Sequence, residues 1–225
     1  NETNSAPPTA QSVVSIVAED GVTSVVEGAA LKYLVTLSGA SGNAQAHAFV
    51  LGGTASGNHL GMISFSNGGT LVDGKVVVPA GAASFTVTVP TVDDSLVEDT
   101  ESVILTIGTA KAEAAIQDND SQTVTSIVAE QGVTSVVEGS SLKFLVTLSG
   151  PADGARSHVF SLGGDADSTD LGTISFSNGV TLVDGKVVVP AGVTSFTVTG
   201  PTVGGRLVEG TEILTLTIGA GKAGG

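Results

Sequence analysis

The chain has 225 residues, a net charge of −14 at pH 7, no cysteine and no tryptophan. The lack of cysteine excludes disulfide bridges, and the negative charge disfavours binding to nucleic-acid phosphates or to anionic lipid. No apolar run is long enough to span a membrane. From the charge we therefore expect no binding to nucleic acid, and from the lack of a long apolar run we expect no insertion into a membrane.

The first elements in chain order are a polar tail and a series of short strands. Residues 1–11 contain Pro7 and Pro8 and are typical of a linker. Runs rich in Val, Ile and Thr with period-two alternation then predict strands at 12–18, 23–26, 31–38, 47–51, 62–66, 84–89, 101–107 and 111–117. Between two further apolar runs, Asp73-Gly74 predicts a hairpin turn. Seven or eight short antiparallel strands in about 105 residues predict a β-sandwich of immunoglobulin-like type.

From residue 122 onward the sequence repeats itself with an offset of 111 residues. The segment Gly21–Gly28 returns as Gly132–Gly139, and Leu71–Gly81 returns as Leu182–Gly192, without a gap between the copies. A repeat of this length has the size of a whole domain rather than of a solenoid unit. We therefore expect an all-β chain of two tandem sandwiches, with a tail at 1–11, repeat 1 at 12–121 and repeat 2 at 122–225.

Repeat 2 departs from repeat 1 at its end. Gly225 aligns with Ala114, so the 225 residues hold no counterpart of Ala115–Asp120 (AIQDND). The final strand of repeat 2 is therefore expected to be missing or cut short, which would leave its neighbour as an unpaired edge. The other strands of repeat 2 are expected at the positions of repeat 1 plus 111.

Acidic residues gather at three places in repeat 1. Glu27 follows the second predicted strand, TVDDSLVEDTE stands between two later strands, and DND (118–120) ends the repeat. The loops at one end of a sandwich could bring these carboxylates together, where each like-charged pair costs on the order of 1 kcal/mol. Oxygen-only ligands of high negative charge suit Ca²⁺ rather than Zn²⁺. The alternative interpretation is a set of exposed, solvated acids at loop tips.

The combination of VVEG, LVTLSG, TISFSNG, TVPTVDDSLVEDTE and QDND resembles the Calx-β domain, and more closely the Calx-β-like extender repeats of giant, type I secreted (RTX-type) bacterial adhesins. The resemblance covers nearly the whole chain, twice. It implies a cluster of Ca²⁺ ions at the end of the domain that leads to the next one. The ligands that it implies in repeat 1 are Glu27, Asp93, Asp94, Glu98, Glu101, Asp118 and Asp120.

At several other positions, this chain lacks an acid that the resemblance implies. Where family members carry a further acid, repeat 1 has His59 and repeat 2 has Asp170. Repeat 2 keeps Glu138, Asp170, Glu209 and Glu212 as candidate ligands, but Gly204 and Gly205 replace Asp93 and Asp94. It also gains a DxDxxD loop at Asp165, Asp167 and Asp170, which could hold Ca²⁺ or be a solvated acidic loop, since its sixth residue is not the Gly of an EF-hand.

No residue pattern of an enzyme occurs in the sequence: there is no GxSxG, HExxH or Cys–His arrangement. His47 and His158 recur at matching positions and are expected to be packing or surface residues beside Phe49 and Phe160. The favoured hypothesis is a calcium-stabilised extender of a bacterial cell-surface adhesin that serves attachment and biofilm formation. It would be extracellular and monomeric, with the neighbouring repeats of the same chain as its partners. The alternative is an adhesin module that itself binds a carbohydrate or a protein.

Overall fold

The computed structural model describes residues 10–166, 169–204 and 210–224. Apart from two single 3₁₀ turns, its regular elements are strands. In the first repeat these are β1 (Val13–Ala18), β2 (Ser24–Val26), β3 (Ala30–Leu37), β4 (Gln45–Gly53), β5 (Ser64–Phe65), β6 (Thr70–Val72), β7 (Lys75–Val78), β8 (Ser84–Pro90), β9 (Glu101–Ile107) and β10 (Ala110–Gln117). No helix long and apolar enough to cross a membrane occurs in the described part of the chain.

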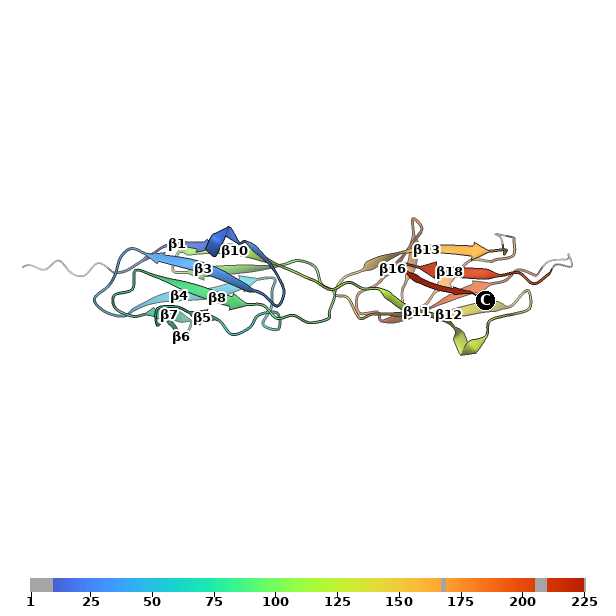
Figure 1. The fold of residues 1–225 in the computed structure, drawn as a ribbon, viewed down its shortest axis with the longest axis horizontal. Helices are drawn as coiled ribbons and strands as arrows, with labels where there is room; N and C mark the ends of the chain where they lie inside the picture. Colours follow the sequence, from blue (N-terminus) through green and yellow to red (C-terminus); the bar gives the residue numbers. More distant parts are fainter. Residues whose placement is uncertain (1–9, 167–168, 205–209, 225) are drawn as a thin grey trace, which may run out of the picture. The chain divides into compact units, whose positions relative to one another are not determined.

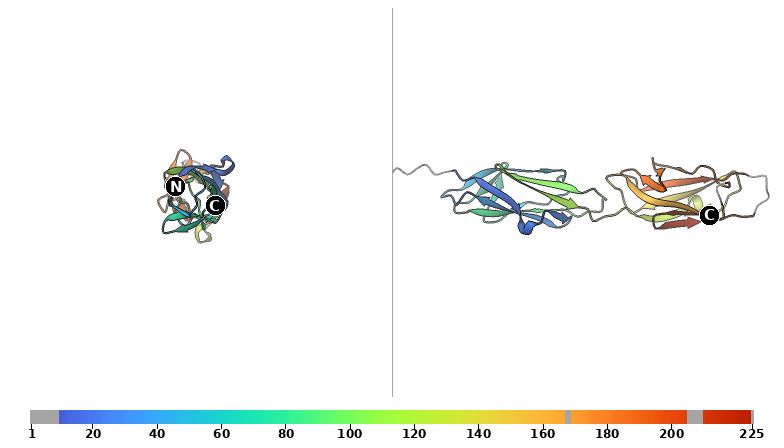
Figure 2. Two further views of the ribbon diagram at one scale, coloured as in Figure 1. Left: turned by 90° about the vertical axis from the view of Figure 1, so that its left-hand side faces the viewer. Right: turned by 90° about the horizontal axis from the view of Figure 1, so that it is seen from above.

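The strands of the first repeat form two facing sheets. One sheet has the order β1-β3-β8-β5 and the other the order β2-β10-β9-β4-β7-β6 (Figures 1 and 2). The pairs are antiparallel, with one exception: β2 runs parallel to the end of β10. This is the predicted immunoglobulin-like sandwich, and its strands lie where the alternation of apolar residues placed them. It has ten strands rather than seven or eight, because the Asp73-Gly74 hairpin contributes two short ones.

The second repeat forms its own pair of sheets from β11 (Val124–Ala129), β12 (Ser141–Leu148), β13 (Arg156–Gly164), β14 (Ser175–Phe176), β15 (Thr181–Val183), β16 (Lys186–Val189), β17 (Ser195–Pro201), β18 (Leu214–Ile218) and β19 (Gly221–Gly224). The sheet orders are β11-β12-β17-β14 and β15-β16-β13-β18-β19. A strand was also expected at 134–137 by the offset of 111, and this prediction is wrong. In unit 1 the equivalent strand, β2, pairs with Ala115–Gln117 at the end of β10.

Contacts between Cα atoms divide the chain into two compact units. Unit 1 contains residues 1–94 and 100–119, and unit 2 contains residues 95–99 and 120–225. Within unit 2, Val97 is buried and accepts a hydrogen bond from the Asp153 N–H at 2.9 Å. Arg156 pairs with Asp99 at 3.3 Å and with Asp153 at 2.9 Å.

Each unit has a core of aliphatic side chains around a line of three phenylalanines. In unit 1 the rings of Phe49, Phe65 and Phe85 follow one another at centroid distances of 5.7 and 6.4 Å. The equivalent rings of unit 2 repeat this arrangement at 5.7 and 6.5 Å. Because the same inward positions of each strand carry apolar residues in both repeats, the two cores are closely similar without tryptophan or disulfides.

One core position differs between the units in a way that can be measured. Tyr33 is fully buried in β3, and its hydroxyl has no hydrogen-bond partner among the residues that the structure describes. Burial raises the pKa of the Tyr33 phenol to about 12. The equivalent residue of unit 2 is Phe144, which is likewise buried. Unit 1 therefore carries a buried polar group that unit 2 does without.

We expect Tyr33→Phe to stabilise unit 1 by about 1 kcal/mol, because it removes a buried hydroxyl that makes no hydrogen bond. The measurement is urea unfolding followed by circular dichroism, since Tyr33 is the only tyrosine and the variant has no fluorescent reporter. The matched change Phe144→Tyr should destabilise unit 2 by a similar amount. A loss of stability in Tyr33→Phe would mean that the hydroxyl is hydrogen-bonded in solution.

Candidate metal centre

Glu27 is a buried residue at the start of the turn from β2 to β3. It is the one buried acid among the residues that the structure describes, with 7% of the residue exposed. The backbone holds it in place: its N–H donates to the Gln117 carbonyl at 3.0 Å, and its Oε1 accepts the Asn119 N–H at 3.3 Å. The parallel pairing of β2 with β10 is therefore what brings Glu27 to residues 117–119.

The electrostatic surroundings of Glu27 oppose its ionisation. Burial raises the pKa of the Glu27 carboxyl above its ordinary value, and a hydrogen bond and the charge of Asp118 raise it further, as does the charge of Asp94. The Asn119 N–H acts in the opposite direction and lowers it. The charged groups that shift this pKa are acids. A bound cation at this place would remove the cost of ionising Glu27.

Asn119 holds Asp93 near Glu27 by a hydrogen bond, and Gly28 leaves room for the Asp93 side chain. The Asn119 side-chain amide donates to Asp93 Oδ1 at 2.7 Å. Gly28 has a φ of +80°, where residues with a Cβ are strained, and a Cβ built on it would lie 3.1 Å from Asp93 Cβ, so a glycine favours this close approach. Asn119 therefore ties Glu27 and Asp93 together through its backbone and its side chain.

Two groups of potential metal ligands occur among the described residues. Glu27 and Asp118 of unit 1 belong to one of them, in which the ligand atoms lie within 4.8 Å of one another, and His59 and Glu101 of unit 1 belong to the other. Within the second group, His59 Nδ1 lies 3.3 Å from Glu101 Oε2. Of the seven acids named from the sequence, Glu27, Asp118 and Glu101 are thus found in these groups, and Asp93 shares Asn119 with Glu27. Asp94 acts on Glu27 through its charge, whereas Glu98 and Asp120 belong to unit 2.

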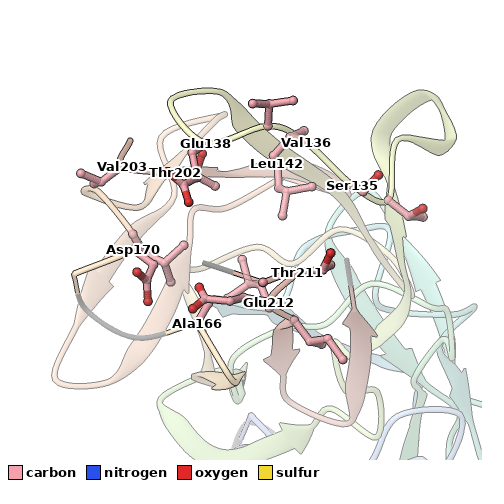
Figure 3. A pocket seen from close by; sticks show the side chains of 16 residues that line it. Ser135, Val136, Glu138, Leu142, Ala166, Asp170, Thr202, Val203, Thr211 and Glu212 are labelled. Carbon is pink, nitrogen blue, oxygen red and sulfur yellow. The ribbon is translucent and has the colours of Figure 1, made fainter. Parts of the chain in front are cut away.

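The candidate ligands of repeat 2 are arranged differently. Glu138, Asp170 and Glu212 line a cavity of about 540 Å³, and Figure 3 shows Glu138 on one side of it and Asp170 and Glu212 on the other. Glu138 is exposed, whereas its counterpart Glu27 is buried. Glu209, and Asp167 of the DxDxxD loop, lie outside the described residues. Asp165 is exposed, and its N–H donates to the Ile213 carbonyl at 2.9 Å.

The structure also shows a glutamine–histidine pair in each unit, buried in unit 1 and partly buried in unit 2, that the sequence patterns did not reveal. His47 Nε2 lies 3.4 Å from Gln11 Oε1, and the Gln11 amide donates to the carbonyls of Gly39 and Ala82. His158 and Gln122 form the same pair at 3.3 Å. Burial lowers the pKa of both histidines. These histidines therefore have a packing role, and Gln11 belongs to the first sandwich rather than to the tail.

The chemistry of the acidic site follows from its donor set. Glu27, Asp93, Asp94 and Asp118 offer oxygen atoms from irregular loops, a ligand type that hard cations such as Ca²⁺ prefer. Glu27 and Asp93 already share Asn119, which orients them before any ion arrives. The residues present therefore fit Ca²⁺ binding in repeat 1.

Comparison with known proteins gives weak structural likenesses. No family model and no curated protein matches the chain. Among solved structures, domains 5–6 of the S-layer protein SbsC share 15% identity over 95% of this chain and 96% of that one, with a TM-score of 0.28. CBD12 from CALX1.2 shares 14% identity over 91% and 79%, with a TM-score of 0.34. The titin domains z1z2 in complex with telethonin share 13% identity over 97% and 94%, with a TM-score of 0.25.

Proposed function

We propose that this chain is a pair of calcium-stabilised extender repeats from a large bacterial surface adhesin. The repeats would hold a distal adhesive domain away from the cell for attachment and biofilm formation. The observation that carries the proposal is the position of Glu27: a buried carboxylate whose charged neighbours, Asp118 and Asp94, are also acids. Calcium would be the counterion of this group, and the resemblance to Calx-β-like extender repeats supports that choice.

The mechanism couples folding to the calcium concentration. Without a cation, ionised carboxylates around Glu27 repel one another and oppose closure of the loop ends. Outside a cell, where calcium is abundant, ions would neutralise these carboxylates and stabilise the folded sandwich. For a site with a Kd tenfold below the free calcium concentration, mass action supplies about 1.4 kcal/mol. Several sites of this kind could decide whether the repeat folds.

The role of a spacer is supported by the duplication itself. Both copies keep apolar residues at most core positions, the same hairpin and the same glutamine–histidine pair. Selection for a repeated stable body, rather than for one special surface, explains why the interior is retained in both. Repetition of one domain along the chain is the property that a stalk requires.

The test is a comparison of thermal unfolding with excess calcium and with EGTA. Tyr33 fluorescence reports on unit 1 alone, because the chain has no other tyrosine and no tryptophan. We expect calcium to raise the midpoint of the Tyr33 transition by about 5 °C or more, since about 1 kcal/mol shifts a 100-residue domain by roughly that amount. Magnesium at the same concentration is the control for general screening. An unchanged midpoint would reject the proposal.

A further inference from the structure

Each unit carries an Asn-Gly pair in a tight turn at the edge of a sheet. In unit 1 the pair is Asn67-Gly68, with φ values of +53° and +74°, and the Gly69 N–H closes the turn by donating to the Ser66 carbonyl at 3.1 Å. Two positive φ values in succession are those of a type I′ turn, which asparagine and glycine adopt most readily. Asn178-Gly179 of unit 2 has φ values of +55° and +72°. Both asparagines are exposed.

The side chain of each asparagine joins its turn to a neighbouring strand of the same sheet. Asn67 Nδ2 donates to the Ser84 carbonyl at the start of β8 at 2.9 Å. Asn178 Nδ2 donates to the Ser195 carbonyl at the start of β17 at 2.7 Å. The strands that precede the two turns, β5 and β14, have two residues each and lie at the edge of their sheets. The asparagine amide therefore prolongs a very short pairing, and it uses an N–H donor that a carboxylate does not possess.

The short strand before each turn carries a central residue of the core. Phe65 of β5 is the middle ring of the three phenylalanines of unit 1, between Phe49 and Phe85. The equivalent Phe176 of β14 is the middle ring of unit 2. Because β5 pairs with β8 at only two positions, the hydrogen bond from Asn67 is a substantial part of what holds this strand to its sheet. Its loss would loosen the strand that places the central ring.

An asparagine that precedes glycine is open to attack by its own backbone, because glycine has no side chain that obstructs the attacking nitrogen. In this reaction the Gly68 nitrogen bonds to Asn67 Cγ while the bond from Cγ to Nδ2 breaks. Nδ2 leaves as ammonia, which also carries away the proton of the Gly68 N–H. Water then opens the five-membered imide at one of its two carbonyls. The product is an aspartate or an isoaspartate, in which the main chain continues through the side-chain carbonyl.

In the folded sandwich the turn keeps the reacting atoms apart. Closure of the imide ring requires the Gly68 nitrogen to rotate toward the Asn67 side chain, out of the type I′ turn that the hydrogen bond from Gly69 to Ser66 closes. It also requires Asn67 Cγ to turn away from the Ser84 carbonyl, which breaks the hydrogen bond to β8. We propose that Asn67 and Asn178 are deamidation sites that react when their repeat unfolds and are protected while it is folded.

Deamidation makes the consequence of unfolding permanent. A carboxylate in place of the Asn67 amide has no N–H for the Ser84 carbonyl, and it adds negative charge to a chain whose net charge is already −14. An isoaspartate also inserts an additional carbon atom into the main chain of the turn. Each repeat therefore keeps a chemical record of the time that it has spent unfolded, and a modified repeat unfolds more readily than before. This property does not depend on calcium, so it stands apart from the proposed function.

Asn67→Asp reproduces one product of the reaction and measures its effect on stability. We expect the variant to lower the thermal midpoint of unit 1 by about 5 °C, the shift that a lost hydrogen bond produces in a domain of this size, with Tyr33 fluorescence as the signal. Asn43→Asp is the matched control, because Asn43 is an exposed loop residue of the same unit and the change adds the same charge. Equal midpoints for the two variants would overturn the claim that the modification weakens the repeat.

The rates are measured on the unchanged full chain at mildly alkaline pH, once in buffer and once in guanidinium chloride above the unfolding transition. Peptide mass spectrometry follows the replacement of the NH₂ group by OH at each asparagine. We expect Asn67 and Asn178 to react at least about tenfold more slowly in the folded chain than in the unfolded one. In guanidinium chloride both should react faster than Asn43, which precedes an alanine. Equal rates in the folded and the unfolded chain, or no excess over Asn43 in the unfolded chain, would overturn the proposal.

Discussion

Gly53→Ala is expected to unfold the first sandwich at markedly lower urea concentration than the unchanged chain. Gly53 ends β4 with a φ of +115°, a region that residues with a Cβ rarely adopt. A Cβ built on it would lie 2.1 Å from the Ser102 carbonyl oxygen and 2.7 Å from the Ser102 carbonyl carbon. Because both atoms belong to the backbone, no side-chain rotation relieves the overlap.

Gly53→Ala would also disturb hydrogen bonds at the start of β9. The Ser102 carbonyl accepts the Ala55 N–H at 3.1 Å, and the Ser102 N–H donates to Thr54 Oγ1 at 2.8 Å. Displacing Ser102 would break these hydrogen bonds and move the neighbouring Glu101. We expect a loss of about 3 kcal/mol or more in the unfolding free energy of unit 1, from backbone strain and lost hydrogen bonds together.

The control for Gly53→Ala is its neighbour in the same strand. Gly52 has open space around an added Cβ, so Gly52→Ala should change the unfolding free energy by less than about 1 kcal/mol. Tyr33 fluorescence measured against urea reports both variants. Similar midpoints for the two variants would contradict the account of this turn. Gly164, where an added Cβ would overlap the Ile213 carbonyl, should behave like Gly53 in unit 2.

Glu27→Gln is expected to change the stability of unit 1 in opposite directions with and without calcium. The pKa of the Glu27 carboxyl is raised in the folded state. The protonated carboxyl therefore adds to the unfolding free energy at a pH below the unfolded-state pKa, and this contribution is lost as the pH rises through the folded-state pKa. In EGTA, at a pH above the folded-state pKa, the ionised carboxylate therefore destabilises the fold. Glutamine keeps the shape and the acceptor for the Asn119 N–H but carries no charge.

In EGTA at pH 7 we expect Glu27→Gln to raise the unfolding free energy of unit 1, because the variant removes a buried acid whose pKa is raised by folding. In calcium we expect the variant to lose the calcium-dependent increment of about 1.4 kcal/mol or more. The measurement is the Tyr33 transition in urea under both conditions. Glu113→Gln is the control, because Glu113 is an exposed acid of the same unit, 3.8 Å from Lys111. A variant that is destabilised equally in EGTA and in calcium would show that Glu27 has only a structural role.

The architecture was accessible from the sequence because it depends on local patterns. Alternating apolar residues in 31–38 and 84–89 gave the positions of β3 and β8, and Asp73-Gly74 gave the hairpin between β6 and β7. The offset of 111 residues carried these assignments to the second repeat. It failed at 134–137, since a strand there depends on a partner far away in the sequence rather than on its own residues.

The geometry of the site was less accessible. Acid spacing indicated Glu27, Asp93 and Asp118, but not that Asn119 would join the first two through its backbone and its side chain. Asn119 is the middle residue of DND, and because it carries no charge, a search for acidic residues passes over it. The parallel direction of β2 against β10 was missed for a related reason: pairing across about 90 residues leaves no local pattern, so only the fold shows which loops meet.

The most direct test of calcium binding is the amide resonance of Asn119 in the full chain during a calcium titration. Asn119 donates to Glu27 from its backbone and to Asp93 from its side chain, so an ion bound to these carboxylates must change both signals. We predict shifts of both Asn119 signals that saturate at millimolar calcium, with little change at Asn178, whose amide donates to the Ser195 carbonyl in unit 2. Asn119 signals that stay unchanged at saturating calcium would contradict the account.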